Sequence, residues 1–165
     1  MLINTRFELV KEINAAKYKT GVEVGVREGY FSYYLLKHSK LKQLHSVDPW
    51  AGRHGEQDYQ NAKSMLKHFG NRSTLVREAS NQVYNRFKGV DFVYIDANHR
   101  YKYVREDIAL WWSVLAPGGM LSGHDYVDAK GCGVITAVDE FVAREGLELR
   151  VTDEHLATWY VTKPK

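Results

Sequence analysis

Apolar runs and amphipathic stretches alternate along the whole chain. The runs are short and rich in β-branched and aromatic residues, as strands are, whereas the stretches between them repeat their apolar residues every three or four positions, as helices do. Strands are predicted over residues 21–26, 44–48, 74–78, 91–96 and 120–123. Helices are predicted over residues 5–17, 30–39, 57–69, 81–87, 101–115 and 134–145. This order predicts a parallel sheet with helices on both faces.

The end of the chain follows a different pattern. Two further strands are predicted over residues 147–152 and 157–162, with only residues 153–156 between them. A connection this short cannot cross the sheet, so the two strands should form an antiparallel hairpin. We therefore expect an α/β, Rossmann-like fold with a seven-stranded, mostly parallel sheet. Residues 1–165 should form a single domain, with an entry helix within residues 1–20 and the terminal hairpin within residues 147–163.

Composition and charge indicate which partners and which cellular compartment to expect. A net charge of +3, without a basic run, does not favour a nucleic-acid partner. The lone cysteine, Cys132, excludes an internal disulfide and suits a reducing compartment. The apolar runs are far shorter than the ~20 residues of a membrane span, and the N-terminus lacks a signal-peptide core. These features predict a cytoplasmic protein.

The turn after the first strand reads GVEVGVREG over residues 21–29. Gly25 allows a close backbone approach, and Gly29 permits the turn into the helix. A dinucleotide site would need G-x-G-x-x-G to hold a pyrophosphate. Glu23 stands in place of the first glycine, and it suits the ammonium and sulfonium of S-adenosylmethionine (SAM) better than a phosphate. An ordinary strand–helix turn would explain the two glycines alone. Asp48, however, ends the second strand, where an acidic side chain can accept hydrogen bonds from ribose hydroxyls.

Five segments carry a family resemblance, in order between residues 21 and 141: GVEVGVREGYFS, HSVDPW, DFVYIDANHRY, LAPGGMLSGHDY and GVITAVDEF. The chain resembles the class I SAM-dependent methyltransferases, and more narrowly the small-molecule and sugar O-methyltransferases related to macrolide and cephalosporin biosynthetic enzymes. The resemblance implies that Trp50 lies near the adenosine and Ser80 faces the adenine. Core packing of Trp50 and helix capping by Ser80 are the alternatives. The full set of expected cofactor contacts is Glu23, Gly25, Val26, Gly29, Asp48, Trp50, Ser80 and Asp96.

Candidate catalytic groups follow the fourth and fifth strands. Methylation of an aliphatic hydroxyl needs a general base, a metal that acidifies the hydroxyl, or both. The resemblance implies that Asp96 and Asp125 hold a divalent cation, such as Mg²⁺ or Mn²⁺, and that His99 is the general base. His124 departs from the family, whose metal-binding members carry an acidic residue there, and this leaves room for a softer ion or for none. Asp96 and His124 are further catalytic candidates. The structural alternatives are a helix cap for Asp96, a surface position for His99 and a hydrogen-bonding role for His124.

The family resemblance also suggests a class of methyl acceptor. We expect methyl transfer to a hydroxyl of a sugar, a sugar-containing metabolite or a glycan. A phenolic or nitrogen acceptor and a non-catalytic SAM-binding module are the alternatives. The loops after the second and fifth strands are too short for a substrate domain, which predicts an open site or one completed by a second subunit in a homo-oligomer. Asp107, on the helix predicted over residues 101–115, is expected to be a solvated or capping charge.

Overall fold

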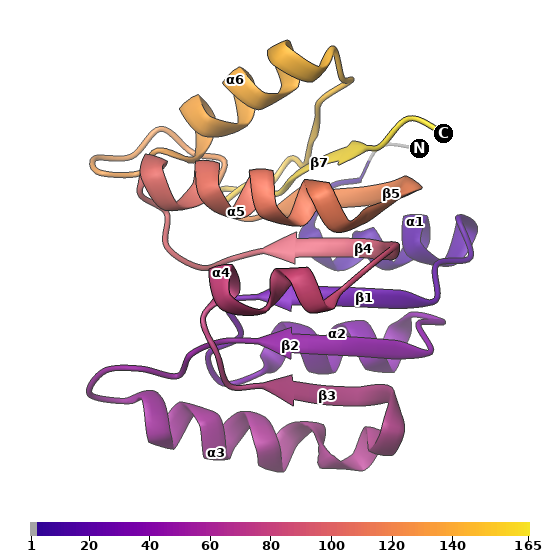
Figure 1. The fold of residues 1–165 in the computed structure, drawn as a ribbon, viewed down its shortest axis with the longest axis vertical. Coiled ribbons are helices and arrows are strands. Elements are labelled where there is room, and N and C mark those ends of the chain that lie inside the picture. Colours follow the sequence, from indigo (N-terminus) through magenta and orange to yellow (C-terminus); the bar gives the residue numbers. More distant parts are fainter. Residues whose placement is uncertain (1–2) are drawn as a thin grey trace.

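A seven-stranded sheet forms the centre of the molecule (Figure 1). The computed structural model describes residues 3–165. The strand order is β3-β2-β1-β4-β5-β7-β6; the first five strands pair in parallel, and β7 lies antiparallel to both β5 and β6. The predicted Rossmann-like sheet with its terminal hairpin is therefore confirmed. The strands are β1 (Thr20–Val24), β2 (Gln43–Val47), β3 (Ser73–Val76), β4 (Val90–Ile95), β5 (Leu115–Gly123), β6 (Arg150–Val151) and β7 (Trp159–Thr162).

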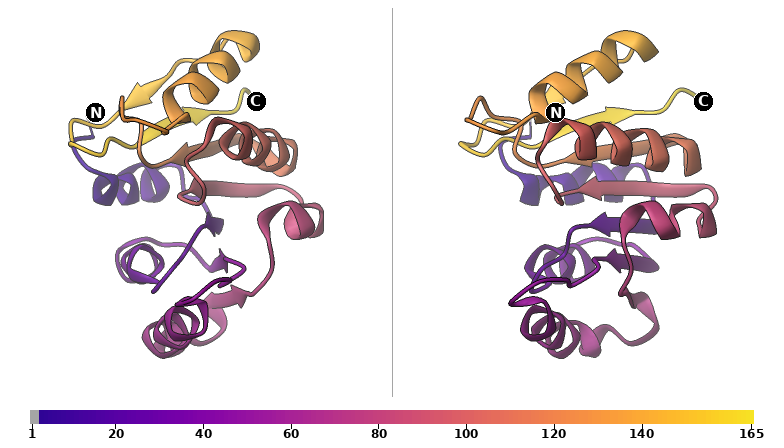
Figure 2. Two further views of the ribbon diagram at one scale, coloured as in Figure 1. Left: turned by 90° about the vertical axis from the view of Figure 1, so that its left-hand side faces the viewer. Right: turned by 60° about the vertical axis from the view of Figure 1, so that its left-hand side comes forward.

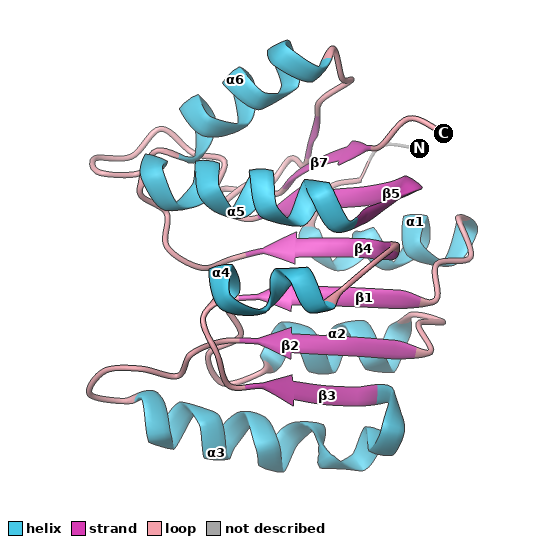
Figure 3. Ribbon diagram, viewed as in Figure 1, coloured by secondary structure: helices cyan, strands magenta, loops and turns pink. Residues whose placement is uncertain are grey.

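Helices cover both faces of the sheet (Figures 2 and 3). Residues of α1 and α2 pack in one hydrophobic cluster, together with the end of α3, and residues of α4, α5 and α6 pack in a second cluster on the other face. The α-helices are α1 (Leu9–Ala15), α2 (Tyr30–His38), α3 (Gly55–Leu66), α4 (Ser80–Val83), α5 (Tyr101–Val114) and α6 (Val134–Glu145). The 3-10 helices are η1 (Arg6–Glu8), η2 (Lys67–Arg72) and η3 (Tyr84–Arg86). Within residues 3–165, each helix is too short or too polar to cross a bilayer.

The buried strand β4 shows why its sequence is almost continuously apolar. Phe92 and Tyr94 point into the cluster under α1 and α2, whereas Val93 and Ile95 point into the cluster under α5 and α6. Since successive side chains of a strand face opposite sides, a strand covered on both faces must be apolar at nearly every position. The same alternation determines towards which face of the sheet the side chains at the strand ends point.

Several predicted helices are interrupted by tighter turns. The entry helix predicted over residues 5–17 consists of η1 and α1, and it ends before Lys17, whose φ of 61° is left-handed. The helix predicted over residues 81–87 is divided between α4 and η3. Short 3-10 turns are common at helix ends, and periodicity alone does not distinguish them from α-helix.

The strand boundaries also differ from the prediction, most of all those of β5 and β6. β5 begins at Leu115, not at Met120, and its pairing with β4 changes register between Val90 and Phe92, opposite the segment that contains Pro117. Proline cannot donate to the ladder, which explains the irregular pairing. The strand predicted over residues 147–152 is reduced to β6, at the exposed edge of the sheet, because the residues before it pack against the hydrophobic cluster under α6.

Candidate functional site

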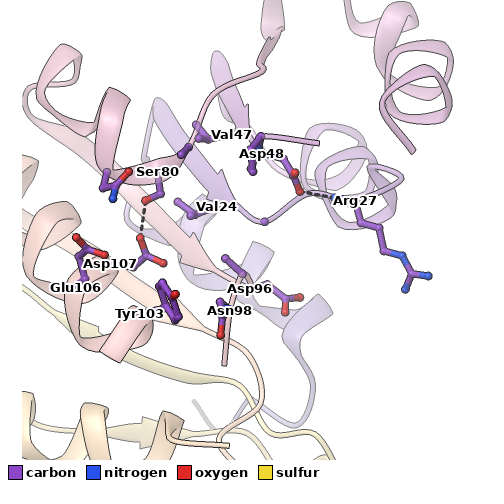
Figure 4. Close-up of a pocket in the computed structure, with 15 residues that line it drawn as sticks. Val24, Arg27, Val47, Asp48, Ser80, Asp96, Asn98, Tyr103, Glu106 and Asp107 are labelled. Atoms are coloured by element: carbon purple, nitrogen blue, oxygen red, sulfur yellow. Dashed lines mark hydrogen bonds between the residues drawn. The ribbon is translucent and has the colours of Figure 1, made fainter. Parts of the chain in front are cut away.

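A cavity of about 560 Å³ lies where the strand order reverses, at the carboxyl ends of β1 and β4 (Figure 4). Its walls come from the residues that follow β1, β2, β3 and β4, and from α5. Ligands of open parallel sheets bind at this switch point. The location of the cavity therefore makes it the candidate cofactor site.

Backbone hydrogen bonds beyond the strand ends place three of the expected site residues. The Asp96 N–H donates to the Val24 carbonyl at 2.7 Å, and the His124 N–H donates to the Ile95 carbonyl at 3.0 Å. The Asp48 N–H donates to the Val76 carbonyl at 3.1 Å. Each residue thus continues the ladder of its neighbouring strand, which brings side chains distant in the sequence to one edge of the sheet.

The turn after β1 depends on its two glycines. Gly25 and Gly29 both have φ of +87°, in the region that favours glycine. A Cβ on Gly25 would overlap the carbonyl of Asp96, whereas a Cβ on Gly29 would meet Ala62 of α3 at 3.2 Å. Gly25 therefore allows β1 and β4 to end side by side, and Gly29 allows α2 to begin against α3.

Asp48 lines the cavity and also organises the loop around it (Figure 4). Its Oδ2 accepts hydrogen bonds from the Val26 N–H at 2.8 Å and the Arg27 N–H at 3.0 Å, and its Oδ1 accepts one from the Trp50 N–H at 2.7 Å. Arg27 and Trp50 have left-handed φ values of 52° and 44°. The carboxylate stabilises this strained turn. The contact of Asp48 with the ribose stays a prediction.

Trp50 is 4% exposed and packs in a small cluster with Val26 and Ala62. Its indole N–H donates to the Arg27 carbonyl at 2.7 Å, and its ring meets the ring of Tyr59 edge-on at a centroid distance of 5.0 Å. Trp50 is not among the cavity-lining residues. The structure therefore gives it the packing role that was the alternative, and its contact with the adenosine stays a prediction.

Glu23 is buried behind the turn rather than in the cavity wall. It is 2% exposed and is hydrogen-bonded by the Ser32 hydroxyl, which also lies 2.6 Å from the Ser46 hydroxyl. Burial raises the pKa of Glu23 to about 8, so its carboxyl group is mostly protonated at neutral pH. In this structure Glu23 connects β1, α2 and β2 as a neutral acid, and its contact with the cofactor stays a prediction.

Ser80 and Asp107 form the wall of the cavity on the side of α4 and α5 (Figure 4). The Ser80 hydroxyl donates to Asp107 Oδ1 at 2.6 Å and accepts a hydrogen bond from Trp111 Nε1 at 2.8 Å. Ser80 makes no side-chain cap bond to α4, so the capping alternative is wrong. The expectation for Asp107 is also wrong: it is 7% exposed, and burial raises its pKa to about 6. It is buried because α5 turns this face towards the cavity.

The catalytic candidates form one cluster beyond the ends of β4 and β5. His99 Nε2 lies 2.9 Å from Asp125 Oδ2 and 3.5 Å from Asp96 Oδ1. His124 Nδ1 lies 3.3 Å from Asp125 Oδ2 and 3.9 Å from Asp96 Oδ1. Asp96 lines the cavity, and the His99 side chain is 43% exposed. The structure thus brings together all four residues that the sequence singled out here.

The electrostatics of this cluster favour cations. The hydrogen bond with Asp96, and then the charges of Asp125 and Asp96, raise the pKa of His99, against the opposing effect of partial burial. Asp125 has a left-handed φ of 55°, which directs its carboxylate at both histidines. Arg6 of η1 adds a positive charge, with Nη1 at 3.6 Å from Asp96 Oδ2.

A divalent cation fits the donor set of this cluster. One ligand atom each of Asp96, His124 and Asp125 lies within 4.8 Å of the others. Two carboxylate oxygens and one imidazole nitrogen suit Mn²⁺, Fe²⁺ or Zn²⁺ better than Mg²⁺, which prefers oxygen ligands alone. The side chains therefore could hold a metal, with Arg6 as the nearby positive charge.

Comparison with known proteins identifies the family. A family model described as a methyltransferase domain matches residues 22–126, from β1 through the end of β5. The chain belongs to this methyltransferase family. A curated relative, an uncharacterised protein of Acanthamoeba polyphaga mimivirus, is 27% identical over 134 residues. The match covers 75% of this chain and 59% of the relative, so the chain spans about three fifths of the length of that relative.

Solved methyltransferase structures share the fold. An O-methyltransferase of tomaymycin synthesis from Streptomyces achromogenes, solved with SAM, has a TM-score of 0.71 at 12% identity, over 96% of this chain and 79% of that chain. An O-methyltransferase from Bacillus cereus, solved with S-adenosylhomocysteine (SAH), has a TM-score of 0.70 at 15% identity, over 95% and 80%. The N-methyltransferase NodS from Bradyrhizobium japonicum has a TM-score of 0.72 at 17% identity, over 97% and 95%. This methyltransferase domain therefore has the fold of SAM-dependent enzymes with different acceptors.

Two residues of the site were not found from the sequence. The sequence places Arg6 only in the entry helix, and it predicts a solvated or capping charge for Asp107. The one signal available for Asp107 was its spacing from Val104, Ile108 and Trp111, which places it at the border of the apolar face of α5. Nothing near Arg6 in the sequence indicates a contact with a strand end 90 residues later.

Proposed function

We propose that this domain transfers a methyl group from SAM to a hydroxyl oxygen, and that a sugar hydroxyl is the acceptor class. The observation that carries the proposal is the position of His99. It lies against two carboxylates, beside the cavity, at the strand ends where ligands of this fold react. The neighbours solved with SAM and SAH support the choice of cofactor.

SAM supplies an electrophilic methyl group, so the chain must position the acceptor and remove its proton. With Nε2 of His99 directed at Asp125, the Nδ1 lone pair is left to accept the hydroxyl proton. Asp125 and Asp96 orient the ring and stabilise the imidazolium that results. The half-exposed His99 side chain can be reached by an acceptor that approaches from solvent.

A bound divalent cation would add a second means of activation by lowering the pKa of a coordinated hydroxyl. Asp96, His124 and Asp125 are the residues that would hold it. His99 remains available for proton transfer, because it is not needed as a ligand in that set.

The sugar part of the proposal rests on the family resemblance of the sequence and on the open approach to His99. An aliphatic hydroxyl holds its proton tightly and needs a base, a metal that acidifies it, or both; His99 would be the base, and Asp96, His124 and Asp125 are the residues that would hold the metal. A phenol ionises more readily and would depend less on His99.

Transfer of a labelled methyl group from SAM tests the proposal directly. The acceptor panel contains oligosaccharides and nucleotide sugars, phenols, and amines, each assayed with a chelator and then with Mn²⁺ or Mg²⁺ restored. We expect incorporation into sugar hydroxyls. Incorporation only into phenols or amines would contradict the acceptor class, and binding of SAM without transfer to any class would favour a non-catalytic module. Activity that survives chelation would exclude the metal and leave the base.

A further inference from the structure

Asp107 presents one unused carboxylate oxygen to the cavity. Among residues 3–165, its hydrogen-bonded partner is Ser80, which donates to Oδ1. No fully buried polar side-chain atom in this part of the chain lacks a partner. Oδ2 is therefore not sealed in the core but faces the cavity that Asp107 lines. A mostly buried oxygen of this kind is costly to leave without a donor.

The direction of the hydrogen bonds around Ser80 is determined. The indole N–H of Trp111 can only donate, so the Ser80 oxygen accepts from it. The single hydroxyl hydrogen of Ser80 then goes to Asp107 Oδ1. Ser80 has no hydrogen left for a ligand, and it acts by holding Asp107 in place.

The position of Asp107 in the cavity indicates which part of the cofactor it meets. The reacting methyl must lie beside Asp96, near His99, and Figure 4 shows the Ser80–Asp107 pair across the cavity from Asp96. The sulfonium that bears the methyl group also carries a short aminocarboxylate arm and a longer adenosine arm. The adenine ring, at the end of the longer arm, is the part of the cofactor furthest from the methyl group. Its 6-amino group is the only hydrogen-bond donor on that ring.

We propose that Asp107 recognises the base of the cofactor, with Oδ2 accepting a hydrogen bond from the 6-amino group of adenine. This assignment rests on the proposed use of SAM and moves base recognition from Ser80, where the sequence placed it, to α5. Burial raises the pKa of Asp107 only to about 6, so at pH 7.5 the group is ionised and can only accept.

The test compares SAH with S-inosylhomocysteine, in which an oxo group replaces the 6-amino group. Calorimetry at pH 7.5 should show that the wild-type protein binds SAH about 10- to 100-fold more tightly, because the oxo group places an acceptor against the carboxylate. Equal affinities would overturn the proposal while leaving the use of SAM intact. Binding of neither ligand would overturn the proposed function, and this assignment with it.

Asp107→Asn gives a sharper outcome because the change keeps the shape of the side chain. Ser80 must donate to the new amide carbonyl, so the amide NH₂ turns towards the base and matches the oxo group. The preference should fall by about 10-fold or more and move towards S-inosylhomocysteine. A purely structural Asp107 would instead weaken both ligands equally and leave the ratio unchanged, which would overturn the proposal.

Glu106→Gln separates the neighbouring carboxylate from Asp107. Glu106 also lines the cavity but is exposed. Its substitution by glutamine removes one negative charge, as Asp107→Asn does. We expect Asp107→Asn to change the ratio of the affinities for SAH and S-inosylhomocysteine, and Glu106→Gln to leave this ratio unchanged. A change of this ratio in Glu106→Gln but not in Asp107→Asn would overturn the assignment to Asp107.

Discussion

Glu23 and Asp107 are two buried carboxyl groups that form no ion pair within residues 3–165. Each receives its hydrogen bond from a serine, Ser32 and Ser80 respectively. The cause of both raised pKa values is burial, and the value is higher for Glu23, at about 8, than for Asp107, at about 6. At neutral pH the first is therefore mostly a neutral acid within the framework, and the second is mostly a carboxylate at the cavity wall.

The raised pKa of Glu23 predicts a specific dependence of stability on pH. Between its ordinary pKa of 4.5 and about 8, the folded state keeps the proton that the unfolded state has lost. This group therefore stabilises the fold fully below pH 4.5, and its contribution decreases as the pH rises to about 8, by on the order of 5 kcal/mol. Glu23→Gln, a neutral isostere, should flatten this part of the profile in urea unfolding. Glu28→Gln, the same change in the same turn, should keep the wild-type slope; an unchanged slope in Glu23→Gln would contradict the assignment.

His99 is the residue on which turnover should depend most. His99→Ala should lower turnover by about 10²- to 10⁴-fold because the acceptor proton loses its base, while SAH affinity stays near the wild-type value. His68→Ala, an exposed histidine of η2 before β3, is the matched control and should remain active. If both His99→Ala and the double variant with His124→Ala kept near-wild-type turnover, proton removal by these histidines would be excluded.

At the scale of elements, the turns after β1 and β2 form one unit. Asp48, at the end of β2, accepts from the backbone of the β1 turn and from its own turn. The same segment carries left-handed residues, so its conformation depends on these hydrogen bonds. The predicted cofactor contact of Asp48 and the stability of the turn would therefore depend on the same side chain.

Asp48→Ala should for this reason weaken SAH binding and also destabilise the protein. Loss of the bonds from Val26, Arg27 and Trp50 should cost roughly 1–3 kcal/mol of unfolding free energy. Asp48→Asn keeps one good hydrogen-bond acceptor, so its stability and its SAH affinity should lie between those of the wild type and Asp48→Ala. Urea unfolding measures the stability, and calorimetry with SAH measures the affinity. A loss of affinity with unchanged stability would show that the turn does not need the carboxylate.

At the scale of the whole molecule, both ends of the chain contribute to the approach to the site. The Arg6 N–H donates to Glu154 Oε1 at 2.7 Å, so η1 is attached to the loop between β6 and β7. The Arg6 side chain meanwhile reaches Asp96 after β4. The N-terminal turn and the terminal hairpin thus meet beside the candidate catalytic cluster, which links three distant parts of the sequence.

Ligand binding should be visible in the stability of the whole fold. At a concentration 100 times its dissociation constant, SAH should add about 2.7 kcal/mol and raise the melting temperature by on the order of 5–10 °C. NAD should have no such effect, because its pyrophosphate would face a cavity lined by Asp48, Asp96, Glu106 and Asp107. Differential scanning calorimetry measures both. A shift with NAD and none with SAH would contradict the proposed cofactor.

Local patterns in the sequence were enough to predict the succession of strands and helices along the chain, the terminal hairpin, and the residues that follow each strand. These features depend on local periodicity and turn chemistry, which a short window of residues contains. Since parallel strands end at the same edge of a sheet, these features together with the family resemblance were enough to predict that Asp96, His99, His124 and Asp125 belong to one site.

The directions of the remaining side chains depend on how the helices pack on the sheet. Glu23 lies behind its turn, Asp107 faces the cavity, and Arg6 reaches Asp96, because the packing of α2, α5 and η1 on the sheet sets these directions. A burial cost or a pKa depends on neighbours from elements far apart in the chain, and no local pattern contains them. The surroundings that the sequence did not predict are accordingly those of groups whose partners come from another element.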